Sequence, residues 1–101
     1  MIKIAAICGM GLGSGLLVKM GVERVLKRNG IDERDFSVEV GDISTAKSLW
    51  PDIFVTSTEF GARLKEQDIP VIEVHNLFDE KEIEAAFVPA FKELLAKKKN
   101  S

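Results

Sequence analysis

The single cysteine of the chain, Cys8, stands at the mouth of a glycine-rich loop and is the side chain best suited to chemistry. An apolar run that begins at Ile2 precedes it, and glycine takes four of the seven positions that follow. A loop of this kind between a buried strand and a helix gathers backbone N–H groups at the positive end of the helix dipole, which favours anions. The same environment stabilises a thiol as its nucleophilic thiolate. The pattern predicts a thiolate that attacks an anionic electrophile held by the loop.

A phosphoryl group fits this loop. Attack by the Cys8 sulfur would give a thiophosphate whose oxygens accept hydrogen bonds from the backbone N–H groups that follow. Glycines allow the backbone to approach closely, and Ser14 adds a hydroxyl donor and could cap the next helix. We therefore predict Cys8 as the catalytic residue and, as phosphate-binding residues, Gly9, Met10, Gly11, Leu12, Gly13 and Ser14.

Common phosphate-binding patterns other than a cysteine cradle do not fit the loop. The dinucleotide pattern G-x-G-x-x-G fails because its last position is Ser14 or Leu16, and the first lysine after the loop, Lys19, is too distant for a Walker loop. Cysteine-dependent phosphatases place an arginine six residues after the nucleophile, where this chain has Ser14. A loop without arginine or lysine favours passing the phosphoryl group onward. A phosphatase-like hydrolase and a redox or anion-sensing module stay as alternatives.

Composition limits the partners and the compartment. The chain has 101 residues, of which 46% are hydrophobic, and predicts a single domain over residues 1–101. A net charge of -2 argues against nucleic acid or an anionic membrane as partner and favours proteins or small molecules. One cysteine cannot form an internal disulfide, which points to the reducing cytoplasm. No segment reaches the roughly 20 apolar residues of a membrane span. We expect no direct membrane insertion, no metal and no cofactor.

Short apolar runs alternate with amphipathic stretches, as in an α/β domain whose sheet is mostly parallel. The strand at 69–74 contains Pro70, which predicts an edge strand. A polar turn is expected at 57–59, and Asp42 or Ser44 is a candidate cap for a short helix that ends at Leu49. Strands are predicted at 2–7, 36–40, 52–56 and 69–74, and the other helices at 14–28, 60–66 and 79–97.

Two of these helices are expected to cover the sheet with an apolar face. In the helix predicted at 14–28, apolar residues recur at helical spacing: Leu16, Leu17, Met20, Val22, Val25 and Leu26. In the last helix Pro89 predicts a kink or a division. The residues of the last helix that we expect to point inward are Ile83, Phe87, Phe91, Leu94 and Leu95.

The loop resembles the phosphorylation loop of the cytoplasmic IIB components of the bacterial phosphoenolpyruvate-dependent sugar phosphotransferase system. The likeness rests on Cys-Gly-x-Gly-x-Gly-Ser at 8–14 directly after the first strand, and it covers essentially the whole chain. Three further segments are similar to the ascorbate-type branch within the lactose-cellobiose-like superfamily: Val-Gly-Asp at 40–42, Asp-Ile-Phe-Val-Thr-Ser-Thr at 52–58 and Val-x-Asn at 74–76.

The resemblance implies a single-domain three-layer sandwich, a four-stranded parallel sheet in the order 2-1-3-4 with helices on both faces. It also implies a phosphotransferase that works through phosphocysteine. A histidine of the IIA phosphodonor protein would phosphorylate Cys8, and Cys8 would pass the group to a sugar held by the IIC membrane transporter. The sugar would be ascorbate-like, or a pentitol or hexitol. The family loop commonly ends in two serines, whereas this chain has Gly15 at the second position.

Four more residues are secondary candidates for the phosphoryl site because they follow strands whose carboxyl ends share one edge of the sheet. Ligands of open α/β sheets bind beyond these ends, near the point where the strand order switches. The candidates are Thr56, Ser57, Thr58 and the only histidine, His75. Lys19 and Arg63 could reach the phosphate from neighbouring helices, although solvated surface charge is the simpler interpretation of both.

Overall fold

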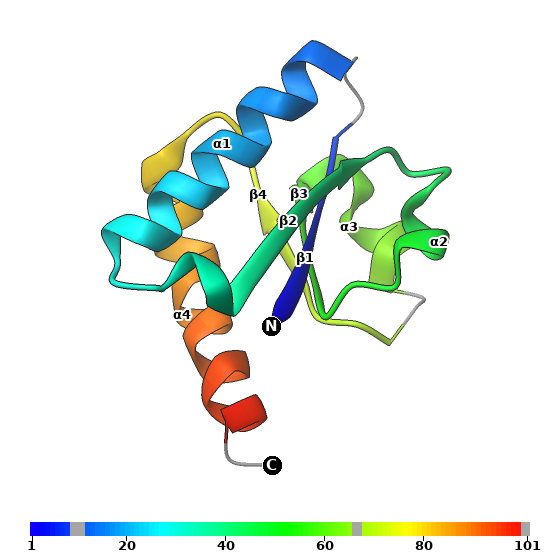
Figure 1. Ribbon diagram of the computed structural model, residues 1–101. Coiled ribbons are helices and arrows are strands. Elements are labelled where there is room, and N and C mark those ends of the chain that lie inside the picture. The colour runs from blue at the N-terminus through cyan, green and yellow to red at the C-terminus, as the bar shows by residue number, and fades with distance from the viewer. Residues whose placement is uncertain (9–11, 66–67, 100–101) are drawn as a thin grey trace.

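The computed structural model describes residues 1–8, 12–65 and 68–99, and the side chains of 12–14, 47 and 99 are not described. The elements alternate along the chain as the sequence predicts, with every predicted strand present (Figure 1). The described elements are β1 (Ile2–Ile7), α1 (Leu12–Arg28), the 3-10 helix η1 (Glu33–Asp35), β2 (Phe36–Gly41), α2 (Ala46–Leu49), β3 (Ile53–Ser57), α3 (Thr58–Leu64), β4 (Val71–Val74) and α4 (Glu80–Lys99).

The four strands form one parallel sheet in the order β2-β1-β3-β4, which confirms the predicted topology. The central strand β1 lies between its two partners, with Ile4 opposite both Val38 and Ile53. The edge position of β4 agrees with Pro70, which stands just before the strand and accepts a hydrogen bond from the Phe54 N–H through its carbonyl.

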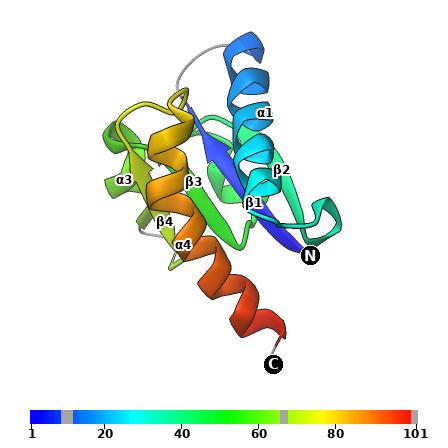
Figure 2. The same cartoon turned by 90° about the vertical axis from the view of Figure 1, so that its left-hand side faces the viewer.

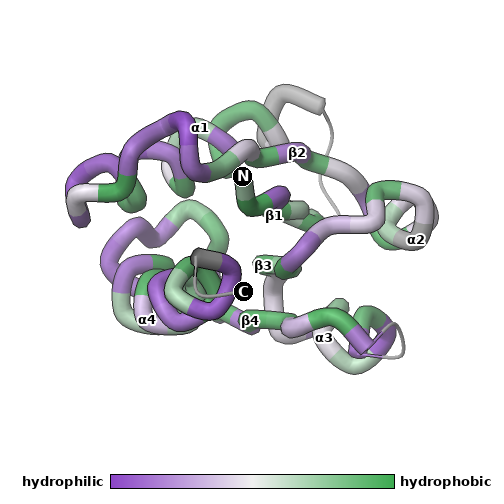
Figure 3. Tube along the Cα trace, turned by 60° about the horizontal axis from the view of Figure 1, so that its bottom comes forward, coloured by the Kyte–Doolittle hydropathy of each residue, from purple (hydrophilic) through white to green (hydrophobic). Residues whose placement is uncertain are grey.

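Side chains alternate between the two faces of the sheet, and each face has its own core. Helices α1 and α4 cover one face, which Figure 2 shows from the front, and α2 and α3 cover the other (Figure 3). The larger core lies under α1 and α4 and includes Val22, Phe87 and Phe91. The smaller core lies under α2 and α3 and consists of Ala5, Ile7, Ala46, Phe54 and Leu64. The expected three-layer sandwich is therefore confirmed.

The apolar face of α1 differs in part from the prediction. Val22, Val25 and Leu26 are buried as expected, but the exposed fractions are 58% for Leu16, 59% for Leu17 and 43% for Met20. The buried row instead continues toward the start of the helix through Val18. In the long helix, the three inward residues Ile83, Phe87 and Phe91 are fully buried, and Leu94 and Leu95 pack against the same core.

Helix boundaries give three corrections. The expected turn at 57–59 is wrong, because β3 continues to Ser57 and α3 begins at Thr58. The division at Pro89 is also wrong, since α4 runs without interruption from Glu80 to Lys99. The short helix ends at Leu49 as expected, but its first residue is Ala46 and its N-cap is Thr45, so neither Asp42 nor Ser44 occupies the cap.

Asp52 fastens the amino ends of β1 and β3 to the last helix. Its carboxylate accepts hydrogen bonds from the backbone N–H of Lys3 at 2.8 Å and from Lys98 Nζ at 2.7 Å. Partial burial raises the pKa of Asp52, but the hydrogen bond from Lys3 and the charge and hydrogen bond of Lys98 outweigh it, so the pKa is lowered overall.

We predict that Asp52→Asn lowers the free energy of unfolding more at pH 7 than in acid. A lowered carboxyl pKa in the folded state contributes stability above the unfolded-state value of about 3.9, and this contribution is lost as the pH falls through the folded-state pKa. Urea unfolding of the variant and the parent at pH 7 and about pH 2 measures the difference. An equal loss at both values would contradict the prediction.

No helix among residues 1–8, 12–65 and 68–99 is both long and apolar enough to cross a lipid bilayer.

Candidate functional site

Cys8 directly follows the central strand, and hydrogen bonds hold the chain at this point from both neighbouring strands. Its backbone N–H donates to the Gly41 carbonyl of β2 at 3.1 Å. The preceding carbonyl, that of Ile7, accepts a hydrogen bond of 2.8 Å from Thr56 Oγ1 of β3. Because β1 is the strand from which the chain order switches direction, Cys8 stands where open α/β sheets bind their ligands.

The predicted cradle is described only in part. Gly9, Met10 and Gly11 lie outside the described residues, whereas Leu12, Gly13 and Ser14 form the first turn of α1. Ser14 is thus the third residue of the helix and does not precede it as a cap. The first N–H groups of an α-helix have no acceptor within the helix and carry its positive dipole end. The backbone of the first turn therefore offers donors to an anion near the end of β1.

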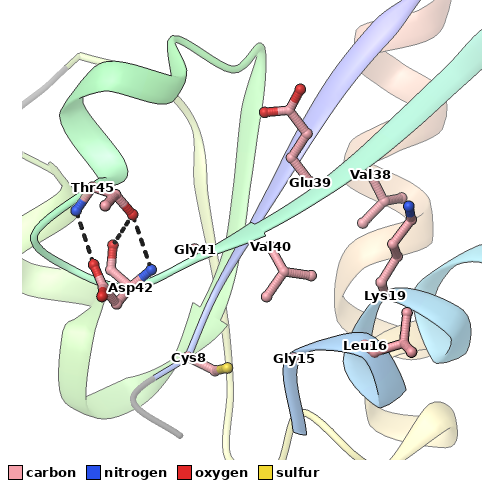
Figure 4. A pocket seen from close by; sticks show the side chains of 10 residues that line it. All are labelled: Cys8, Gly15, Leu16, Lys19, Val38, Glu39, Val40, Gly41, Asp42 and Thr45. Atoms are coloured by element: carbon pink, nitrogen blue, oxygen red, sulfur yellow. Dashed lines mark hydrogen bonds between the residues drawn. The ribbon is translucent and has the colours of Figure 1, made fainter. Parts of the chain in front are cut away.

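A cavity of about 600 Å³ opens beside Cys8 between α1 and β2. Figure 4 shows Cys8 at the end of β1, with its sulfur turned toward the segment that contains Gly15. The residue itself is only 6% exposed, and it lines this opening and a smaller one described below. The lining residues are Cys8, Gly15, Leu16, Lys19, Val38, Glu39, Val40, Gly41, Asp42 and Thr45.

The charged side chains of this cavity differ in how firmly they are held. Asp42 closes a turn, accepting hydrogen bonds from Ser44 Oγ at 2.6 Å and from the Thr45 N–H at 2.9 Å. These bonds, that from Ser44 first, lower the pKa of the Asp42 carboxyl, and Figure 4 shows the carboxylate turned toward Thr45. The carboxylate oxygen Oε2 of Glu39 lies 3.7 Å from Lys3 Nζ. Among the side chains that the structure describes, Lys19 is the cation that lines this cavity.

Packing against Val40 explains why position 15 is glycine, where the resembled loop commonly has serine. A Cβ at this position would lie 2.6 Å from Val40 Cγ1, closer than side chains approach, and the β-branched valine is stiff at χ1. We predict that Gly15→Ser lowers the free energy of unfolding by about 1–3 kcal/mol, the usual cost of overpacking. Urea unfolding at neutral pH measures the change.

The matched control for this prediction removes the obstructing methyl groups. In a Val40→Ala background the added serine has room, so its cost should fall by about 1 kcal/mol or more relative to its cost in the parent. An equal cost in both backgrounds would show that contact with Val40 is not the reason for the glycine.

A second cavity, of about 130 Å³, borders Cys8 on another side. Two secondary candidates, Ser57 and His75, line it together with Glu59 of α3 and Asn76. The remaining lining residues are Val18, Leu77 and Phe78.

The other two secondary candidates lie differently. Thr56 is fully buried, and its hydroxyl is committed to the Ile7 carbonyl. Thr58 begins α3 and lines neither of the two cavities at Cys8. Of the two cations considered, Lys19 lines the larger cavity and Arg63 lines neither. The fold thus gathers Cys8, Ser57, His75 and Lys19 around the two openings.

Sequence reasoning missed several groups at these openings. The sequence suggests only a helix cap for Asp42, and it gives no indication that Thr45 or Glu39 lies beside Cys8. Glu82 of α4 was not considered, although it accepts hydrogen bonds from the backbone N–H groups of His75 and Asn76. The sequence does hold one indication of a role for Glu82. Asp79 stands three residues before it, and this spacing of Asp and Glu is typical of a helix start.

Comparison of the sequence with known proteins identifies a family. The family model for the phosphotransferase system, lactose/cellobiose specific IIB subunit, matches residues 3–88. The chain belongs to this family. The match runs from β1 into α4 and so includes Cys8, both cavities and the whole sheet. As a IIB subunit, the protein is a component of a sugar phosphotransferase system.

Individual relatives of this IIB subunit carry a narrower name. The ascorbate-specific PTS system EIIB component of Mycoplasma pneumoniae is 32% identical over 89 residues, which cover 84% of this chain and 90% of that protein. The proteins of the same name from Escherichia coli O157:H7 and Shigella flexneri are each 33% identical over 63 residues, which cover 62% of this chain and 61% of theirs.

Proposed function

We propose that this IIB subunit is a phosphocarrier that accepts a phosphoryl group on Cys8 from a histidine of a IIA protein and passes it to a sugar during IIC-mediated transport. The observation that carries the proposal is the position of the thiol. Cys8 directly follows the central strand at the switch point, near the first turn of α1, whose N–H groups have no acceptor within the helix, and it lines two cavities.

Each of the two steps moves one phosphoryl group, and the two together return the subunit to its starting state. In the first, the thiolate attacks phosphorus, an S–P bond forms, and the electron pair of the broken N–P bond returns to the IIA imidazole. In the second, a sugar hydroxyl attacks phosphorus and loses its proton, and the electron pair of the S–P bond returns to sulfur as thiolate. Such transfer depends mainly on positioning and on stabilising the charge of the phosphoryl oxygens.

We assign the charge stabilisation to the backbone of residues 9–14, with the hydroxyl of Ser14 as an additional donor. Thr56 would act through Ile7, because its hydrogen bond fixes the peptide that carries Cys8. Ser57 and Thr58 would form the β3 side of the phosphoryl site, and His75 the β4 side. Neither step calls for a metal ion or a cofactor.

The names of the relatives support an ascorbate-like substrate, with a pentitol or hexitol as the other choices. The partners would be a IIA phosphodonor protein, a IIC membrane transporter and the sugar, with no nucleic acid involved. We propose residues 1–101 as one phosphocarrier domain that works in the cytoplasm without inserting into the membrane.

Two experiments test the carrier function: intact-mass measurement and an assay with a chromogenic aryl phosphate. Incubation with phosphoenolpyruvate and the upstream phosphorylation proteins should add the mass of one phosphoryl group, and adding IIC membranes with sugar should remove it. The protein alone should not turn over the aryl phosphate. Steady turnover that depends on Cys8 would instead establish a hydrolase, and the absence of any mass gain would reject the carrier function.

A further inference from the structure

The Glu82 carboxylate holds the loop between β4 and α4 through three hydrogen bonds. It accepts the backbone N–H groups of His75 at 2.6 Å and Asn76 at 3.0 Å, and it lies 2.8 Å from the ring nitrogen Nδ1 of His75. These contacts, the backbone N–H of His75 first, lower the pKa of Glu82, so the carboxyl is ionised at neutral pH. An ionised carboxylate can only accept hydrogen bonds.

This arrangement fixes which nitrogen of the His75 ring carries a proton. Because Glu82 cannot donate, the 2.8 Å contact requires the proton of a neutral ring to lie on Nδ1. The other nitrogen, Nε2, then has a free lone pair in the neutral ring, and it forms no hydrogen bond with the described groups of residues 1–8, 12–65 and 68–99. The side chain is 87% exposed, so a ligand can reach Nε2.

The fold brings His75 and the nucleophile to the same cavity. His75 and Cys8 line the same cavity of about 130 Å³, between the end of β1 and the loop that follows β4. In Figures 1 and 2 this loop lies at the same end of the sheet as the start of α1. Two carboxylates lie on this side of the site: Glu82 of α4 contacts the ring, and Glu59 of α3 lines the same cavity.

Resting on the proposed function, we infer that His75 contacts the phosphoryl group on Cys8 through Nε2, and that Glu82 is the positioning residue that presents this nitrogen. The segment from Cys8 to Gly15 contains no lysine or arginine, so the dianion lacks a cationic side chain from its own loop. When Cys8 is phosphorylated, the His75 ring takes up one proton from solvent at Nε2. The resulting imidazolium donates to a phosphoryl oxygen through Nε2–H and to Glu82 through Nδ1–H.

Nitrogen-15 NMR of the full chain tests both the protonation of Nε2 and the positioning role of Glu82. His75 is the only histidine, so it gives the only imidazole signals. At about pH 8, the neutral ring of the unphosphorylated protein should carry its proton on Nδ1. After phosphorylation from phosphoenolpyruvate at the same pH, both nitrogens should be protonated. Glu82→Ala should abolish the preference for Nδ1, and Glu82→Gln, which keeps an acceptor for the loop, should weaken it.

Single-turnover transfer from the IIA donor supplies the kinetic readout. His75→Ala should slow the transfer step about tenfold or more, the usual worth of a charge-assisted hydrogen bond, without changing the donor concentration at half-maximal rate. His75→Gln, which keeps a neutral donor near the Nε2 position, should recover part of the rate. Glu93→Ala is the matched control, since Glu93 is an exposed carboxylate on the same helix, and it should leave both values unchanged.

The outcomes separate this inference from the function on which it rests. If Cys8 becomes phosphorylated while the ring stays neutral, or if the His75 and Glu82 variants transfer at the parent rate, the inference is wrong and the carrier function stands. If no phosphoryl group reaches Cys8 in the parent protein, both fail.

Discussion

Replacing Cys8 with serine should eliminate phosphoryl transfer to the sugar. The hydroxyl of serine is far less acidic than a thiol and has no base assigned to it, so it cannot replace the thiolate as nucleophile. Removal of an enzymatic nucleophile lowers rates by factors on the order of 10⁴ to 10⁶. We expect the transfer rate in the reconstituted system, measured with phosphoenolpyruvate and radiolabelled sugar, to fall to background.

The fold of this variant provides the control. Serine is nearly the same size as cysteine, and the position is held by the Gly41 carbonyl through the backbone. Circular dichroism and the urea midpoint should therefore stay close to those of the parent. Ser37→Ala, on β2 at the position opposite Lys3, is a second control that should transfer normally. Transfer that survives in Cys8→Ser would place the phosphoryl group on another residue.

Replacing Phe54 with alanine should cause the largest loss of stability. Phe54 is fully buried and is the largest side chain of the smaller core, which α2 and α3 cover. These helices have four and seven residues and offer little that could collapse into a void. Phenylalanine-to-alanine substitutions in cores cost about 3–5 kcal/mol, and we expect a loss in that range by urea unfolding.

Phe78→Ala is the matched control because it removes the same side chain from a position that is 46% exposed. It should cost less than about 1 kcal/mol, as surface substitutions usually do. Similar losses at the two positions would contradict the burial of Phe54. Since Ile7 belongs to the same small core and directly precedes Cys8, we expect the Phe54 variant to transfer phosphoryl groups more slowly as well.

The architecture could be predicted because it depends on patterns that extend over several residues. The continuous apolar run of β1 predicts a central strand, and the alternation of Phe36, Val38 and Val40 predicts an edge strand. The structure confirms both positions. The exposure of Leu16, Leu17 and Met20 could not be predicted from the sequence. Helical spacing does not tell how far along α1 its neighbours α4 and β2 extend.

Pro89 shows how a proline can lie inside the long helix without dividing it. Proline removes one backbone hydrogen bond and frees the carbonyl four residues earlier, at Ala85. Both Pro89 and Ala85 are exposed, so water can satisfy that carbonyl. Phe87 and Phe91 on either side are fully buried and hold the two halves of α4 to one core.

For the candidate site, the sequence indicates candidate residues but not the groups to which they hydrogen-bond. Cys8 and the glycines after it form one contiguous motif, which is why they could be found. Thr56 is a secondary candidate for the phosphoryl site from the sequence, yet its hydroxyl bonds to a carbonyl 49 residues away along the chain, a pairing that only the sheet creates. Glu82 fits a helix-start pattern in which it would reach back to the Asp79 N–H, but it bonds to His75 and Asn76 instead.

The most direct test of the account is a phosphorus–proton correlation spectrum of the full chain after phosphorylation by the IIA donor. The account predicts one phosphorus signal, coupled through the S–P bond to the Hβ protons of Cys8 and absent in Cys8→Ser. A phosphorus signal coupled instead to the ring protons of His75, or no protein-bound phosphorus at all, would contradict the proposal that Cys8 carries the phosphoryl group.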